Sequence, residues 1–407
     1  SGTQNAAFAD RALRANTTGN YNTALGALSL FSNTTASNNT AVGYQSLYAN
    51  TTGTNLFAFG TNSLRSNTTG NSNASMGGLY SNTTGSNNTA LGMQALNANT
   101  TASDNTAVGY QAAYATTTGA ENTAVGKRAF YNNTTGQFNS SLGLAALFAN
   151  TTGNYNTALG NAALGSNTTA SGNTALGYQA AYSNTTGTEN VLVGDKAGYS
   201  SITANGLTAV GRIALQDNTA SNNTAIGFAV LANNTTGTFN TALGGANYGF
   251  TGGAMHLNTT GSYNTALGNQ ALHNNTTASN SVAVGYQAGY SNVTGSQNTA
   301  LGYQAMYTNT GGTLNTVVGG QAMQNGTSSY NTAIGYQALK AVTGDNNTGV
   351  GYTSLLSNTS GRYNTGLSQS SLQSNTTGFY NTAIGYAALF SNTTASNNTA
   401  VGYKALY

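Results

Sequence analysis

Several residue types on which proteins commonly rely are missing from this sequence. It contains no cysteine, no proline and no tryptophan, and only 4% of its 407 residues are charged. Without cysteine the chain can form neither a disulfide framework nor a cysteine-ligated metal site. Its apolar runs are far shorter than the roughly 20 residues that a membrane helix needs, so we expect no membrane insertion.

Charge of either sign is scarce and scattered. Ten lysines and arginines stand against seven acidic residues, which gives a formal net charge of +3. The basic residues occur singly and form no stripe of the kind that neutralises phosphates. We therefore expect no nucleic-acid partner.

The sequence does contain a short repeated motif. The glycine that closes each "NTAxG", called the anchor glycine below, recurs mostly at intervals of 17 residues, as at Gly160, Gly177 and Gly194. A unit of this length is too short for a helix pair or a propeller blade, and its glycine, asparagine and threonine disfavour helix. The sequence predicts an all-β fold, a parallel β-solenoid (β-roll) of about 24 coils with a 17-residue repeat.

Each coil is expected to hold two short strands, "NTALG" and "YQALY", joined by a tight turn at the anchor glycine and a longer polar turn. At about 4.8 Å per coil the stack would be on the order of 115 Å long. Residues 1–407 then form a single repeat array with an irregular insertion at 244–261. In the insertion Tyr248, Phe250 and His256 form a candidate contact loop, and a tolerated insertion without function is the alternative.

A column of asparagines lies four residues before the anchor glycine. Stacked side-chain amides can hydrogen-bond to the copies above and below, which satisfies polar groups where the coil turns. This predicted structural asparagine ladder includes Asn22, Asn39, Asn88, Asn105, Asn156, Asn173, Asn240, Asn381 and Asn398.

The apolar residues form two columns. Alanine usually lies two residues before the anchor, which predicts a cramped interior, and a large apolar residue lies one before it. Adjacent strand residues face opposite sides, so the large residues need a cover outside the coil. In the second strand we likewise expect the small residue of a pair such as Ser46 and Leu47 to face inward and the large one outward. Association of identical chains provides that cover, whereas a flattened monomeric coil holding both columns is the alternative. The candidate interface residues are Leu25, Val42, Leu91, Val108, Leu176, Leu301 and Val401.

Two stretches resemble a known repeat. "ASNNTAVGYQSL" at 36–47 and "GSNNTALGMQAL" at 85–96 are similar to the head repeats of trimeric autotransporter adhesins of the YadA type, whose pattern is Gly-x-x-Ser/Thr-x-Ala-aliphatic-Gly-x-x-Ala. The full 17-residue repeat, of the form NTAxGYQALYSNTTG, also resembles repeat arrays of bacterial and phage tail-fibre proteins. The resemblance extends over essentially the whole chain, although the adhesin-head unit is shorter than 17 residues. It implies a left-handed, trimeric β-roll outside the cell or on a virion.

Residues suited to catalysis are few. The seven acids are spread over different coils, whereas a glycosidase needs two carboxylates within about 10 Å. His256 and His273 lack a third metal ligand. We therefore expect no enzymatic activity, no catalytic residue, no metal and no cofactor.

These features predict a non-enzymatic structural subunit of an extracellular or virion fibre, a rigid rod for surface display or attachment. It is expected to assemble laterally with copies of itself, with head-to-tail growth as a further option, and surface glycans are a second class of partner. The alternative is an ice-binding or glycan-binding module that uses columns of threonine and tyrosine such as Tyr44, Tyr110 and Tyr178. The Asn-x-Thr sequons at Asn16, Asn33, Asn67, Asn82, Asn184 and Asn233 are interpreted as turn residues.

Overall fold

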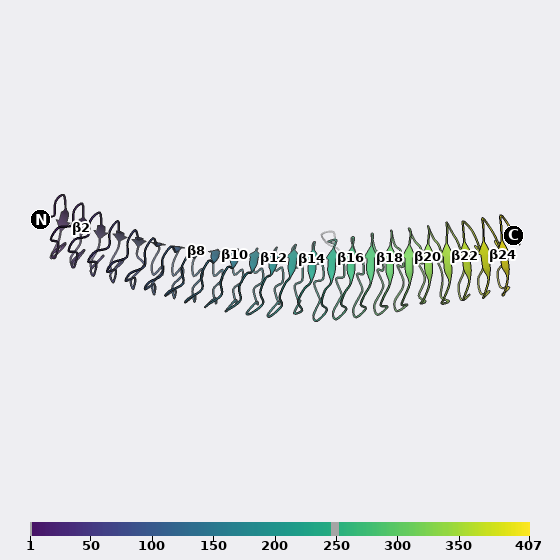
Figure 1. Cartoon of the computed structure of the whole chain (residues 1–407). Helices are drawn as coiled ribbons and strands as arrows, with labels where there is room; N and C mark the ends of the chain where they lie inside the picture. Colours follow the sequence, from purple (N-terminus) through teal and green to yellow (C-terminus); the bar gives the residue numbers. More distant parts are fainter. Residues whose placement is uncertain (1, 246–251) are drawn as a thin grey trace. The chain divides into compact units, whose positions relative to one another are not determined.

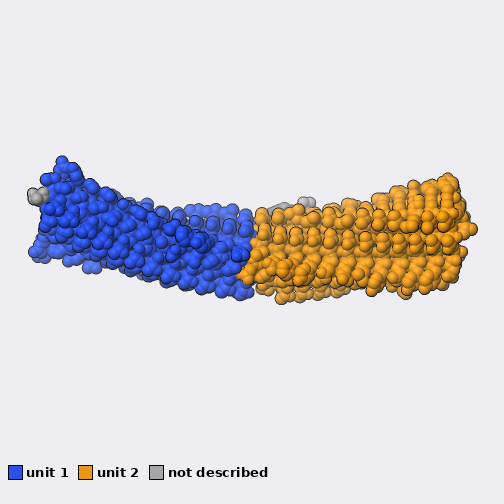
Figure 2. All heavy atoms as spheres, in the orientation of Figure 1, with its two compact units in different colours: residues 1–203 blue, residues 204–407 orange. Residues whose placement is uncertain are grey.

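The computed structural model describes residues 2–245 and 252–407. These residues form strands and turns, and none of them lies in a helix. The chain divides into two compact units, residues 1–203 and 204–407 (Figure 2). Within each unit every coil contributes one three-residue strand, and consecutive strands pair in parallel (Figure 1).

Unit 1 is a single parallel sheet with its turns. Residues one repeat apart lie opposite each other, so that Ala158 pairs with Ala175 and Leu159 with Leu176. Its strands are β1 (Ala6–Phe8), β2 (Thr23–Leu25), β3 (Thr40–Val42), β4 (Phe57–Phe59), β5 (Ala74–Met76), β6 (Thr89–Leu91), β7 (Thr106–Val108), β8 (Thr123–Val125), β9 (Ser140–Leu142), β10 (Thr157–Leu159), β11 (Thr174–Leu176) and β12 (Val191–Val193).

Unit 2 repeats this arrangement even where the coil length changes. Thr316 pairs with Thr332, and Thr241 pairs with Thr265 across the long coil. Its strands are β13 (Thr208–Val210), β14 (Thr224–Ile226), β15 (Thr241–Leu243), β16 (Thr265–Leu267), β17 (Val282–Val284), β18 (Thr299–Leu301), β19 (Thr316–Val318), β20 (Thr332–Ile334), β21 (Thr348–Val350), β22 (Thr365–Leu367), β23 (Thr382–Ile384) and β24 (Thr399–Val401). The predicted all-β parallel solenoid with a 17-residue repeat is confirmed.

The interior of each coil is narrow, as the alanine column predicted. In every strand after β1 the central residue is buried while its two neighbours face outward, as Ala175 lies between Thr174 and Leu176. This alternation is what a sheet with one buried face requires. Only a small side chain fits at the buried position in nearly every coil.

The segment after the anchor glycine is not the second strand that the sequence predicted. It forms tight turns in which the Ser46 N–H donates to the Gly43 carbonyl at 3.3 Å, and in which Gln45 and Leu47 have φ of 53° and 51°. Because this backbone does not alternate like a strand, Ser46 and Leu47 are both buried. The expectation that the large residue of this segment faces outward is therefore wrong, since it fills the core of its own coil.

The predicted asparagine ladder is confirmed. Asn156 is buried, its Oδ1 accepts the backbone N–H of Asn173 at 3.0 Å, and its Nδ2 donates to the carbonyl of Ala170 at 2.8 Å. Bonds of this kind join neighbouring coils at all nine predicted positions. Each coil thus supplies the acceptor that the next coil needs.

A second asparagine ladder runs through the polar turn, seven residues after the anchor glycine. Asn184 Nδ2 donates to Asn167 Oδ1 at 2.9 Å and to the Gly187 carbonyl at 3.0 Å. These turn asparagines belong to the Asn-x-Thr sequons, and most of them are buried, as Asn33 and Asn67 are. Sequence reasoning treated them as ordinary turn residues and missed this role.

The long coil keeps the same core. Ala254 and Met255 are buried and take the places of the alanine and leucine that follow the anchor in other coils, and the Met255 N–H donates to Ala271 at 3.0 Å. Tyr248 and Phe250 of the candidate contact loop lie outside the described residues.

The anchor position favours glycine in most coils for two reasons. Gly177 has a φ of 137°, and a Cβ added there would lie 2.5 Å from the carbonyl oxygen of Gly194 in the next coil. Ser368 occupies the equivalent position with a φ of 113°. A side chain at this position is therefore accommodated only with a changed backbone angle.

We predict that Ser368→Gly raises the thermal unfolding midpoint and that Gly177→Ser lowers it. Relief of the strained backbone in Ser368→Gly should stabilise the chain by about 1 kcal/mol, and the reverse change should cost about 1 to 3 kcal/mol. Differential scanning calorimetry measures both. Equal midpoints for wild type and Gly177→Ser would show that the anchor tolerates a side chain.

Candidate functional site

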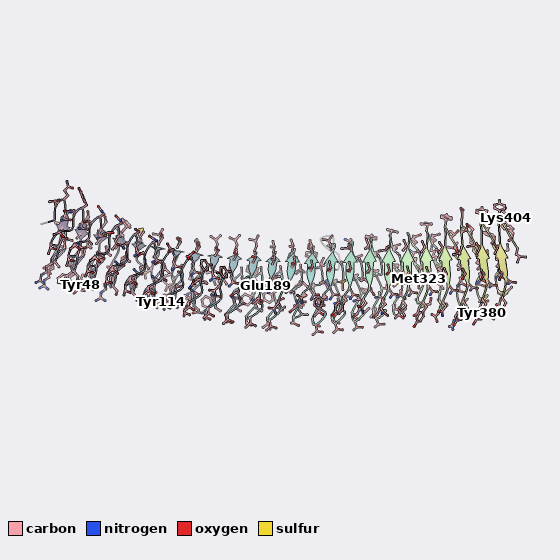
Figure 3. All side chains as sticks on the ribbon, in the orientation of Figure 1. Tyr48, Tyr114, Glu189, Met323, Tyr380 and Lys404 are labelled. Atoms are coloured by element: carbon pink, nitrogen blue, oxygen red, sulfur yellow. The ribbon has the colours of Figure 1, made fainter. Side chains whose placement is uncertain are left out.

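The most regular exposed surface is the outward sheet face, formed by the first and third residues of each strand. The first residue is usually threonine and the third is a large apolar residue, and the side chains repeat from coil to coil (Figure 3). All seven candidate interface residues occupy the third position. Leu25, Leu91 and Leu176 expose 46%, 37% and 40% of their surface, and the other four are also at least partly exposed.

The threonines of the polar turn have two different environments. The first threonine of the turn is engaged in many coils, as Thr134 Oγ1 donates to the Thr151 carbonyl at 3.1 Å. The second, such as Thr135, is exposed. An ice-binding surface would therefore have to use the second turn threonine or the threonines of the outward sheet face. Ice binding by this chain stays a prediction.

Aromatic side chains form stacked columns at three places in the coil. Five residues after the anchor, Tyr114, Tyr131 and Phe148 stack with centroids 5.1 and 5.3 Å apart. One residue after the anchor, Tyr286 and Tyr303 lie 5.7 Å apart. Stacks of this geometry bury ring area between coils and stabilise the corners of the solenoid.

The third aromatic column was not singled out from the sequence. Five residues before the anchor position, three pairs of rings on consecutive coils stack in parallel. We call these residues the loop aromatics. The pairs are Phe138 with Tyr155 at 5.0 Å, Phe239 with Tyr263 at 5.2 Å, and Tyr363 with Tyr380 at 4.9 Å. Most other coils have asparagine, glycine or an acid at this position, and that contrast is the signal that could have identified them.

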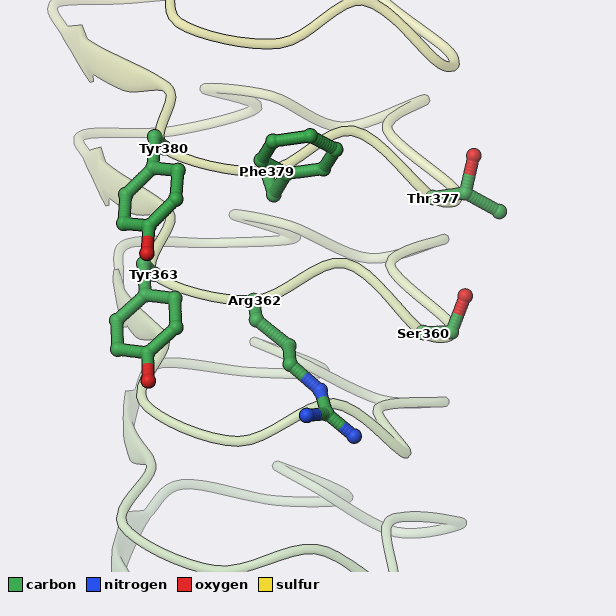
Figure 4. A pocket seen from close by; sticks show the side chains of 6 residues that line it. All are labelled: Ser360, Arg362, Tyr363, Thr377, Phe379 and Tyr380. Carbon is green, nitrogen blue, oxygen red and sulfur yellow. The ribbon is translucent and has the colours of Figure 1, made fainter.

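One pair of loop aromatics borders a surface groove. The groove is lined by Ser360, Arg362, Tyr363, Thr377, Phe379 and Tyr380 (Figure 4). In Figure 4 the two tyrosines lie on one side, the hydroxyls of Ser360 and Thr377 on the other, with Arg362 and Phe379 between them. The equivalent positions of another pair, Thr135, Gln137, Phe138, Thr152, Asn154 and Tyr155, also border a groove.

Two of the acidic residues lie on neighbouring coils. Asp104 and Glu121 lie in the loop-aromatic column of consecutive coils, where both are exposed and Asn87 Nδ2 donates to Asp104 at 3.0 Å. In residues 2–245 and 252–407, no three His, Asp or Glu side chains are grouped so that they could hold a metal ion. No helix of the described chain is long and apolar enough to cross a membrane.

The two histidines are brought together on adjacent coils. Their rings stack with centroids 5.6 Å apart, and His273 in turn stacks on Tyr290. His256 Nδ1 lies 3.0 Å from the carbonyl oxygen of Ala229. Burial lowers the pKa of His256, and the neighbouring His273 lowers it further, while the bond to Ala229 opposes both effects.

No protein-family model matches the chain, and no curated protein matches it.

We predict that acidification destabilises the chain in part through His256. Because its folded-state pKa is lowered, the unfolded chain takes up this proton first, so the free energy of unfolding falls as the pH drops below about 6.5. His256→Tyr keeps a ring in the column and removes this proton. Urea unfolding at pH 7.5 and pH 5 should show a smaller loss for the variant, whereas equal losses would contradict the prediction.

Proposed function

We propose that the chain is a non-enzymatic structural subunit of a fibre outside the cell or on a virion. It acts as a rigid rod for surface display or attachment. The observation that carries this proposal is the row of large apolar side chains on the outward sheet face. Within unit 1, for example, Leu142, Leu159 and Leu176 are 46%, 39% and 40% exposed although their side chains are apolar. A surface of this kind on a repeat protein favours association over enzymatic chemistry.

Lateral association of identical chains is the assembly that this row favours. Soluble monomers rarely expose continuous apolar patches larger than a few hundred Å². A symmetric oligomer covers the same row on every copy with one type of contact. The trimeric state, the left-handed coil and the location outside the cell rest on the resemblance to adhesin-head and tail-fibre repeats.

The ladders support the part of the proposal that concerns stiffness. The buried asparagines hold neighbouring coils in register, and the paired strands add backbone hydrogen bonds between them. Bending such a stack separates these groups on one side, where they are buried and water cannot replace them. A surface made of rows of side chains, without a deep cavity, also suits a protein that acts as a spacer or displays other groups.

We predict that Leu159→Lys with Leu176→Lys weakens self-association, because two desolvated charges would face the partner copy. Sedimentation velocity over a range of concentrations should show oligomers for wild type and a shift toward monomer for the variant.

The matched control is Thr169→Lys with Thr186→Lys, which adds the same charge at exposed turn positions of the same coils. It should assemble like wild type. A wild-type chain that stays monomeric at every concentration would overturn the lateral assembly. Negative-stain microscopy of the same samples would separate trimeric rods from longer end-to-end filaments.

A further inference from the structure

We propose that the groove beside Tyr363 and Tyr380 binds an acidic saccharide. This site is independent of the outward sheet face, because the groove lies between turns of consecutive coils (Figure 4). The ligand class follows from three observations: the strained backbone of the two tyrosines, the arrangement of their rings, and the positive charge of Arg362 beside them.

The loop aromatics lie in a backbone conformation that disfavours them. Tyr363 and Tyr380 have φ of 57° and 56°, where glycine and asparagine are preferred and bulky residues are uncommon. Asn38 and Asn280 occupy the same position of their coils with φ of 62° and 58°. The fold therefore needs no aromatic residue there.

Burial does not compensate for this conformation. Tyr363 and Tyr380 remain 49% and 55% exposed, whereas the leucines with positive φ in the same coils, Leu355 and Leu372, are fully buried in the core. Strained and exposed side chains are a sign of function when the surrounding structure holds them in place, and the stacked pairing of Tyr363 with Tyr380 distinguishes them from the unpaired Tyr330. The occurrence of the loop aromatics in pairs on consecutive coils points to a ligand that spans two coils.

The groove combines three features that recognise a saccharide. The two parallel rings, 4.9 Å apart with an interplanar angle of 9°, form an apolar platform. The C–H face of a pyranose ring packs on such a platform through apolar contact and the negative face of the ring. The hydroxyls of Ser360 and Thr377 line the opposite side, where they can exchange hydrogen bonds with sugar hydroxyls.

Arg362 gives the site its charge preference. Its side chain is exposed, and no ion pair or side-chain hydrogen bond joins it to a residue of the described chain. The acid one repeat earlier in the same column, Asp345, accepts the Ser329 N–H at 2.9 Å and leaves the guanidinium available to a ligand. A guanidinium presents paired donors that match a carboxylate. A saccharide that carries a carboxylate, such as a uronic or sialic acid, therefore fits this groove better than a neutral one.

The test uses the full chain and a glycan array with sialylated, uronic-acid and neutral oligosaccharides, followed by calorimetric titration of the strongest acidic ligand. Wild type should bind acidic members of the array in preference to neutral ones. Tyr363→Asn with Tyr380→Asn should weaken binding about ten-fold or more. Its unfolding midpoint should not fall, because asparagine is the residue that other coils use at this position.

Two further variants separate the contributions. Arg362→Gln should remove the preference for acidic over neutral saccharides. Tyr330→Asn is the matched control, because Tyr330 is an exposed loop-position tyrosine with a φ of 59° whose neighbours in the column, Leu314 and Asn346, are not aromatic. It should bind like wild type.

Three results would overturn the proposal. One is the absence of binding to any acidic saccharide of the array. Another is unchanged affinity in the double tyrosine variant. The third is a changed oligomeric state of that variant in sedimentation velocity, which would assign the rings to contact between copies of the chain.

Discussion

The structure depends on buried asparagine amides that hydrogen-bond to neighbouring coils. Asn156 receives the N–H of Asn173 one coil away, and Asn184 donates to Asn167 in the same manner. An unpaired amide in this interior would be costly, so the hydrogen bonds to neighbouring coils stabilise each coil. This constraint fixes where each coil returns its asparagines and not the coil length, because coils of 15, 16 and 24 residues keep the same ladder bonds.

The ladders also permit a backbone that short peptides avoid. Residues such as Gln45 and Leu47 hold positive φ in coil after coil. Such conformations persist when the surroundings determine them, and here the coils above and below do so. The resulting coil is tight enough to bury its leucine, and it leaves the strand as the one segment that alternates. The outward sheet face and the exposed loop aromatics are consequences of that geometry.

Much of this fold could be predicted from the sequence, for identifiable reasons. The spacing of Gly177 and its equivalents fixed the coil, and the columns of Ala175 and Asn173 indicated a cramped interior and a ladder. The second segment could not be predicted, because positive φ at Leu47 contradicts the local preference of leucine and is set by contacts one repeat away. The role of Asn184 was missed for the same reason, because its partner Asn167 lies one repeat away and Asn184 looks like an ordinary turn residue within its own coil.

The candidate site was predicted less completely. The position of Leu176 on the outward face follows from strand alternation alone. Tyr363 and Tyr380 were overlooked because their column is mixed in composition, and their significance appears only when their backbone angles and exposure are known. A mixed column gives no periodic signal, even where two consecutive members form a site.

The most direct test of the ladder is at a natural gap. Thr116 replaces a turn asparagine, and in this structure Thr116 Oγ1 and Asn99 Oδ1 are buried without a hydrogen-bond partner. Thr116→Asn would restore bonds to Asn99 and Asn133, each of about 1 kcal/mol. Calorimetry should show a higher unfolding midpoint for this variant and no change for Thr118→Asn, an exposed position of the same turn. An unchanged or lower midpoint for Thr116→Asn would contradict the claim that the asparagine ladders hold the coils together.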